Sequence, residues 1–138
     1  MKTAAPGDLG RKLGFRAGMR VGLVQVPPAL EDLLRRSAPT KIRWSRGPGR
    51  ARIDMVFYTP RRRGELPAAW RRLQSRINPD GAIWVIVPRK PVAEKRGLDF
   101  GWEDVQAAAL ETDLVDNKIA SLTDEEYATR FVLRRSAR

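Results

Sequence analysis

The chain has 138 residues, 42% of them hydrophobic, which is enough for one domain with a buried core. Its 27 lysines and arginines outnumber 16 acidic residues, so the formal net charge is +11. Cysteine and histidine are absent, which excludes disulfides, thiolate nucleophiles, histidine bases, Ser-His-Asp triads and the common zinc sites.

The first predicted segment, residues 1–18, is an N-terminal arm with a short helix. Residues 1–8 hold no continuous apolar run, so no secretory signal is expected. The longest apolar run, 82–87, is far shorter than the roughly 20 residues that a membrane span needs. We therefore predict a soluble, cytoplasmic protein without a membrane partner.

The next segment is predicted to be a strand over residues 19–26, which ends at Pro27 and Pro28. A helix follows, because proline fits a first helical turn, where its missing N–H costs nothing. Three leucines in this helix repeat at the i, i+3, i+4 spacing of an apolar face: Leu30, Leu33 and Leu34. Residues 41–44 are predicted to be a short second strand.

The middle of the chain continues this alternation. A Gly-Pro-Gly loop at 47–49 precedes a third, almost wholly apolar strand at 53–58. Residues 65–77 have the periodicity of an amphipathic helix, and 78–81 have the composition of a turn. The fourth strand, 83–87, is apolar on both faces, as is typical of a central strand covered by helices.

The C-terminal part is predicted to contain a helix at 102–112 and strands at 115–122 and 127–133. The short acidic turn at 123–126 requires these strands to form an antiparallel hairpin. Strand–helix alternation with right-handed crossovers predicts an α/β fold, a small Rossmann-like three-layer sandwich. Its mostly parallel sheet is predicted to have the order 2-1-3-4-6-5, with the C-terminal hairpin antiparallel, which is the plan of a reduced methyltransferase fold.

Nucleotide-type cofactors need glycines after the first strand and an acidic residue at the end of the second. Here Pro27 and Pro28 delete two backbone donors, and the second strand ends in Trp44-Ser45-Arg46 without a carboxylate. These departures argue against S-adenosylmethionine or NAD bound in the usual way. We therefore expect no cofactor.

A cationic cluster is predicted at the carboxyl edge of the sheet. Three arginines follow the third strand, and an arginine and a lysine follow the fourth. The cluster consists of Arg61, Arg62, Arg63, Arg89 and Lys90. Parallel neighbouring strands end at the same edge, and guanidinium groups suit phosphate or carboxylate. The sequence thus predicts an anion-binding site there, against the alternative that these side chains are solvated loop ends.

Charge is also segregated along the chain. Residues 1–98 carry a net charge of +15, and residues 99–127 carry −8. A basic body of this kind favours nucleic acid or an acidic partner, with Trp44 as a candidate for stacking on a base.

Catalytic and metal sites have little support in the sequence. Tyr58 and Thr59 lie near the ligand edge, but nothing activates them. The acids at 124–126 are oxygen ligands for a hard cation, although a surface hairpin turn usually leaves such acids solvated. We therefore expect no catalytic residue and no metal.

Three segments resemble the DUF3052 family of bacterial proteins: Leu9-Gly10-Arg11-Lys12-Leu13-Gly14-Phe15, Trp84-Val85-Ile86-Val87-Pro88-Arg89-Lys90 and Leu114-Val115-Asp116-Asn117-Lys118. The resemblance covers most of the chain. It implies a small Rossmann-like domain and supports the hairpin, but it implies no reaction, cofactor or catalytic residue.

Three functional hypotheses follow. The first is a non-enzymatic domain that binds an anionic ligand or partner at the basic edge of the sheet. The alternatives are a nucleic-acid-binding protein and a divergent methyltransferase-like protein dependent on S-adenosylmethionine.

Overall fold

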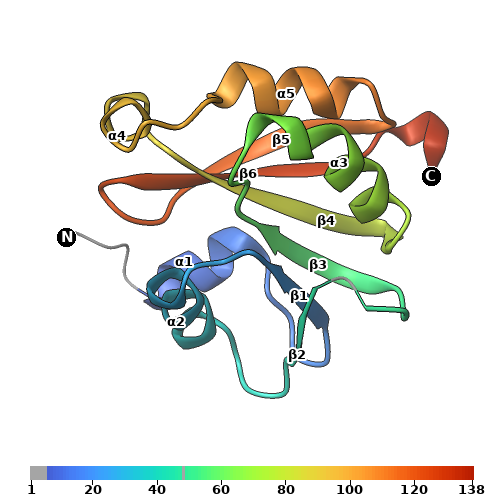
Figure 1. Cartoon of the computed structure of the whole chain (residues 1–138). Coiled ribbons are helices and arrows are strands. Elements are labelled where there is room, and N and C mark those ends of the chain that lie inside the picture. The colour runs from blue at the N-terminus through green and yellow to red at the C-terminus, as the bar shows by residue number, and fades with distance from the viewer. Residues whose placement is uncertain (1–5, 48) are drawn as a thin grey trace.

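A mixed β-sheet runs through the molecule with helices on both faces (Figure 1). This computed structural model describes residues 6–47 and 49–138, so part of the predicted N-terminal arm and of the Gly-Pro-Gly loop lies outside the described residues. The first half contains α1 (Pro6–Leu13), β1 (Arg20–Val24), α2 (Pro28–Ser37), β2 (Arg43–Arg46) and β3 (Ile53–Tyr58). The second half contains α3 (Leu66–Gln74), β4 (Ile77–Pro88), α4 (Lys90–Lys95), α5 (Trp102–Leu110), β5 (Leu114–Ser121) and β6 (Glu126–Leu133), with 3₁₀ turns at Arg63–Glu65 and Arg135–Ala137.

The strand order is β2-β1-β3-β4-β6-β5, which confirms the predicted topology. Strands β2, β1, β3 and β4 run parallel to one another, whereas β6 pairs antiparallel with both β4 and β5. The C-terminal hairpin is therefore part of the main sheet, and β4 and β3 lie near its centre.

Two apolar cores lie on opposite faces of the sheet. Leucines of α1 and α2 pack with Met55, Phe57 and Trp84 on one face. On the other face, Trp70 of α3 packs against Phe131 of β6 with ring centroids 4.7 Å apart. Both faces of β4 are thus covered, which explains its continuous apolar run. None of the described helices is long and apolar enough to cross a lipid bilayer.

The sequence predicted a turn at residues 78–81 between the helix and the fourth strand, but in the structure these residues belong to β4. They form a bulge inside β4, because the register advances from Ile53–Ile77 to Met55–Ala82. A Cβ on Gly81 would lie 3.0 Å from the Asp54 carbonyl oxygen, so glycine favours the close approach of the strands here. The predicted helix at 65–77 accordingly ends earlier, at Gln74. Helix α4 is a further difference, since no helix was predicted directly after the fourth strand.

The β2–β3 connection passes close to Gly22 in the middle of β1. The N–H of Gly47 donates to the carbonyl oxygen of Leu23 at 2.7 Å, and a Cβ on Gly22 would lie 3.1 Å from the Gly47 carbonyl oxygen. The described part of this connection contains no helix, and the next helix on that face is α3. The end of β1 therefore borders α3 directly.

Candidate functional site

The site is built where β1 and β3 end side by side. Strand β1 leads to α2 on one face of the sheet, whereas β3 leads to α3 on the other (Figure 1). Such a switch point opens a crevice beyond the carboxyl ends of the strands, and ligands of open α/β sheets bind there.

Gln25 joins the two strand ends. Its backbone is left-handed, with φ of 59°, a conformation uncommon outside glycine. Its side-chain amide donates to the carbonyl oxygen of Thr59 at 3.1 Å and to Oε2 of Glu65 at 2.7 Å. The backbone N–H of Thr59 also donates to the Val24 carbonyl oxygen at 3.0 Å. The turn after β1 is thus held against the end of β3.

Glu65 is the centre of this hydrogen-bond network. Its Oε2 accepts from the Tyr58 hydroxyl at 2.5 Å as well as from Gln25, and its Oε1 accepts from the N–H groups of Arg61 and Arg62 at 3.2 and 3.0 Å. Burial opposes ionisation of Glu65, but these hydrogen bonds outweigh it and lower its pKa. Burial and the neighbouring carboxylate raise the pKa of Tyr58. Glu65 is therefore an ionised positioning residue whose acceptor sites are filled.

A cavity of about 410 Å³ opens beside this network, between the ends of β1 and β3 and helix α3. It is lined by Val24, Gln25, Tyr58, Glu65, Ala68, Ala69, Arg72 and Leu73. Its volume lies in the range of roughly 300–1,000 Å³ that is usual for small-molecule sites. Arg72 is exposed and forms no ion pair within residues 6–47 and 49–138.

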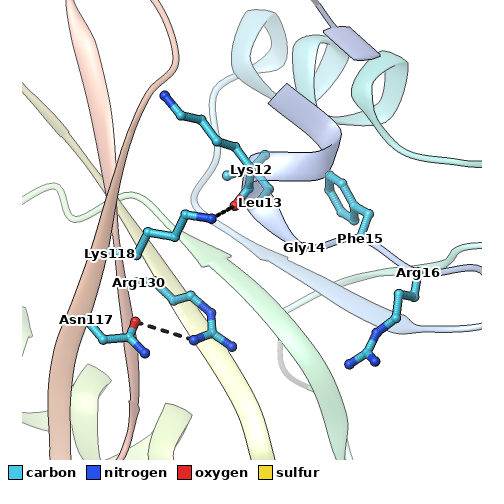
Figure 2. Close-up of a pocket in the computed structure, with 8 residues that line it drawn as sticks. All are labelled: Lys12, Leu13, Gly14, Phe15, Arg16, Asn117, Lys118 and Arg130. Atoms are coloured by element: carbon cyan, nitrogen blue, oxygen red, sulfur yellow. Dashed lines mark hydrogen bonds between the residues drawn. The ribbon is translucent and has the colours of Figure 1, made fainter. Parts of the chain in front are cut away.

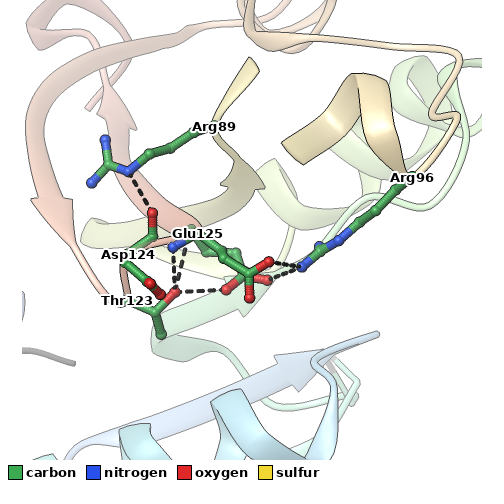
Figure 3. Close-up of polar contacts among 6 residues, drawn as sticks. Arg89, Arg96, Thr123, Asp124 and Glu125 are labelled. Atoms are coloured by element: carbon green, nitrogen blue, oxygen red, sulfur yellow. Dashed lines mark hydrogen bonds and ion pairs between the residues drawn. The ribbon is translucent and has the colours of Figure 1, made fainter. Parts of the chain in front are cut away.

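The five predicted anion-binding cations do leave the same edge of the sheet, but two are committed to partners within the chain. The Arg63 guanidinium pairs with Asp104 of α5 at 3.2 Å. Arg89 donates to the Asp124 carbonyl oxygen at 3.2 Å and to the Ser121 hydroxyl at 3.1 Å, as Figure 3 shows in part. The side chains of Arg61 and Arg62 are exposed, and Lys90 borders a different hollow, between α4 and α5.

The acidic turn before β6 is held by Arg96, the residue directly after α4. The buried Glu126 carboxylate accepts from the Thr123 hydroxyl at 2.7 Å and pairs with Arg96 at 3.0 Å. Arg96 also lies 3.6 Å from Glu125, and Figure 3 shows the two side chains meeting. Among the residues that the structure describes, no group of three or more acidic side chains is arranged to hold a metal ion.

The end of β2 supplies no free carboxylate to a ligand. Arg46 forms two hydrogen bonds with Glu31 of α2, at 2.8 and 3.1 Å, and Arg35 approaches the same carboxylate at 3.0 Å. Helix α2 follows Pro27 and begins with Pro28, so its first turn lacks the donors of a nucleotide cradle.

The strand order and the switch-point crevice define a Rossmann-like α/β fold. The chain is similar to an S-adenosylmethionine-dependent methyltransferase from Aquifex aeolicus, with TM-score 0.65 and 10% identity over 94% of this chain and 89% of that chain. It is also similar to the N-methyltransferase NodS from Bradyrhizobium japonicum, with TM-score 0.61 and 13% identity over 92% of each chain. A TehB-like methyltransferase from Corynebacterium glutamicum gives TM-score 0.58 and 11% identity over 94% of this chain and 88% of that chain. At this identity the likeness shows the fold.

No family model matches the chain, so the resemblance to the DUF3052 family stays a prediction. No curated protein matches it either.

The solved structures overturn the first functional hypothesis. The prediction of a non-enzymatic domain that binds an anion at the basic edge is wrong in the light of these structures. They are methyltransferases, and their similarity extends over nearly the whole length of this chain. They favour the alternative that the sequence left open, a divergent methyltransferase-like protein.

Sequence reasoning identified Tyr58 and Thr59 at the ligand edge but missed Gln25, Glu65 and Arg72. Gln25 has an ordinary strand-end position in the sequence, and its left-handed backbone is visible only in three dimensions. Arg72 lies off the apolar face of its helix, where an arginine usually indicates only solvent exposure.

Proposed function

We propose that this chain is a divergent methyltransferase-like protein whose ligand site is the cavity between β1, β3 and α3. The observation that carries the proposal is the coincidence of a methyltransferase fold over nearly the whole chain with a cavity at its switch point. Function does not follow from fold alone, so the residues of the cavity must suit the ligand.

The cavity suits the amino-acid end of S-adenosylmethionine but lacks a partner for its ribose. The ligand has no phosphate, so the lack of phosphate-binding N–H donors at the start of α2 does not by itself exclude it. Its amino-acid end carries a carboxylate, which Arg72 suits, and its positive charge is favoured near ionised Glu65. Val24 and Leu73 supply apolar wall. The ribose finds no free carboxylate at the end of β2, since Glu31 is paired with Arg46.

The polar residues of the cavity have binding or positioning roles in this proposal. Arg72 binds the ligand carboxylate, and Gln25 and Glu65 hold the two strand ends in place. Tyr58 is protonated at neutral pH, and burial and Glu65 raise its pKa further, so its hydroxyl donates to Glu65 and does not act as a base. When bound, S-adenosylmethionine would supply an activated methyl group; the described residues are assigned to binding and positioning only.

The first test is calorimetric titration of the full chain with S-adenosylmethionine and with S-adenosylhomocysteine. We expect both to bind, and we expect Arg72→Gln to weaken binding by about tenfold, the effect of losing a charge-assisted hydrogen bond. The matched control is Arg71→Gln, which removes the same charge from an exposed neighbour on the same helix. This control should bind as the unmodified chain does.

A second pair of variants tests the cavity without changing charge. Ala68 is exposed and lines the cavity, whereas Ala107 is exposed on α5 and lines none of the described cavities. Ala68→Trp should abolish binding and Ala107→Trp should preserve it. Absence of heat with both ligands in the unmodified chain would overturn the proposed function, and equal binding by the two tryptophan variants would overturn the site.

A further inference from the structure

A second hollow, lined by basic residues, lies away from the switch point. It has a volume of about 370 Å³ and is bounded by the end of α1 and by the middle of β5 and β6. Its lining residues are Lys12, Leu13, Gly14, Phe15, Arg16, Asn117, Lys118 and Arg130. Four of the eight are cationic and none is acidic, which distinguishes it from the cavity at the ends of β1 and β3.

Three of the four cations face the hollow. Figure 2 shows Lys118 and Arg130 reaching from the β-hairpin side and Arg16 from the opposite side, whereas the Lys12 ammonium points away from them. Arg130 and Lys118 are direct partners across the β5–β6 ladder, and this pairing sets the two positive charges close together. The hollow is therefore electropositive because of strand register and not because of a single loop.

These charges lack carboxylate partners in the part of the chain that the structure describes. Within residues 6–47 and 49–138, none of the three cations forms an ion pair with an acidic side chain. Arg130 is half-buried, and burial together with the charge of Arg138 lowers its pKa. Within the described residues its guanidinium has one acceptor, Asn117 Oδ1 at 3.4 Å, so most of its N–H donors are left for a ligand.

The last carbonyl groups of helix α1 border the hollow and already have donors, one of which is Lys118 itself. Lys118 Nζ donates to the Lys12 carbonyl oxygen at 2.8 Å, and Trp84 Nε1 donates to that of Leu13 at 3.2 Å. The N–H groups of Gly14 and Phe15 both donate to Gly10. A ligand entering the hollow would thus meet unused donors and few unused acceptors.

We infer that this hollow is a binding site for a phosphate group, formed by Lys118, Arg130 and Arg16. The planar fork of a guanidinium and the point charge of an ammonium together suit a phosphate group, and an anion there relieves repulsion between the cations. The site is separate from the basic loops at the carboxyl edge, since it lies on the α1 face and at the middle of the β5–β6 hairpin. The phosphate could belong to a free nucleotide or to a nucleic-acid backbone.

The test measures binding of inorganic pyrophosphate to the full chain by calorimetry at constant low ionic strength. Lys118→Gln combined with Arg16→Gln should weaken binding by about tenfold or more, since two charge-assisted contacts are lost. Both side chains are exposed, so the variant is expected to fold, and its melting temperature checks this. The matched control, Lys95→Gln with Arg71→Gln, removes the same charge from exposed positions outside the hollow and should change binding by less than about twofold.

Two further probes distinguish the source of the phosphate. AMP binding that is lost in the double variant assigns the site to free nucleotides, and loss of oligothymidylate binding assigns it to a nucleic-acid backbone. Equal weakening by the double variant and its control, or no pyrophosphate binding to the unmodified chain, would overturn the inference. Arg72→Gln should leave pyrophosphate binding unchanged, so this outcome does not depend on the proposed function.

Discussion

At the scale of single residues, Glu65 determines how the end of β3 is arranged. Its carboxylate receives hydrogen bonds from Gln25, Tyr58 and two backbone N–H groups of the loop before α3. Only the ionised form has acceptor sites for all four donors. The lowered pKa of Glu65 is thus a direct consequence of the network that holds the two strand ends together.

Glu65→Gln should lower the free energy of unfolding by about 2 kcal/mol at neutral pH, because the amide turns a donor toward groups that are themselves donors. The folded-state pKa of Glu65 is below its ordinary value of 4.5, so its stabilising contribution is present above 4.5 and is lost as pH falls through the folded-state pKa. Urea unfolding should therefore show the difference between the two chains shrinking in acid.

The control for this variant is Glu94→Gln, at an exposed carboxylate without a side-chain hydrogen bond in the described residues. Its effect should stay within about 0.5 kcal/mol. A difference between Glu65→Gln and the unmodified chain that does not depend on pH would contradict the assignment of Glu65 as an ionised hub.

At the scale of elements, the contact between α1 and α2 depends on one glycine. A Cβ on Gly10 would lie 2.1 Å from the carbonyl oxygen of Ser37 at the end of α2, a backbone atom that cannot rotate away. Leu9 and Leu13, on either side, are buried in the core of this face. The two helices approach closely because position 10 has no side chain.

Gly10→Ala should therefore lower the free energy of unfolding by about 2–3 kcal/mol, the usual effect of overpacking. Gly7→Ala on the same helix is the matched control, since nothing lies within 4 Å of its added Cβ. That substitution should stabilise the chain slightly, by about 0.5 kcal/mol, because alanine favours helix. Urea unfolding measures both, and a neutral Gly10→Ala would contradict the close approach of the helices.

At the scale of the whole molecule, the net charge of +11 leaves many cations without partners. The ion pairs of the described residues join arginines to acids, so the surplus positive charge remains at the surface. Surplus charge of one sign destabilises the folded state through self-repulsion. Salt screens that repulsion.

The free energy of unfolding should accordingly rise when KCl increases from about 10 to 150 mM, since the Debye length falls from about 30 to 8 Å. The control removes three exposed cations that form no ion pair with any described residue, with Arg71→Gln, Lys95→Gln and Arg135→Gln in one chain. Its stability should respond less to salt. A stability that falls as KCl is added would show that ion pairs outweigh the repulsion.

Much of the fold was predictable because its signals are local. The third strand was predicted with its observed limits, 53–58, and the acidic turn correctly predicted the hairpin. The bulge at 78–81 was not predictable, since residues of this composition occur both in a turn before a strand and in a bulge inside one. Helix α4 was missed because its residues also suit a loop.

The candidate site was less predictable than the fold. The sequence located the ligand edge and marked Tyr58 and Thr59, but it placed Glu65 only at the start of a predicted helix and gave Arg72 no role. Conversely, Arg63 and Arg89 were predicted to be free for a ligand, and each has a partner within the chain: Asp104 for Arg63, and the Asp124 carbonyl for Arg89. Side-chain partners that are distant in sequence decided these roles.

The order of the strands, the two-sided burial of β4 and the excess of positive charge were determined by the sequence itself, because periodicity, turn residues and charge are properties of short segments or of composition. Only the tertiary structure decided which polar groups meet. Gln25 reaches Glu65 across 40 positions, and Lys118 reaches the end of α1 across 106. Such meetings depend on strand register and helix docking, which arise only when the whole sheet is assembled.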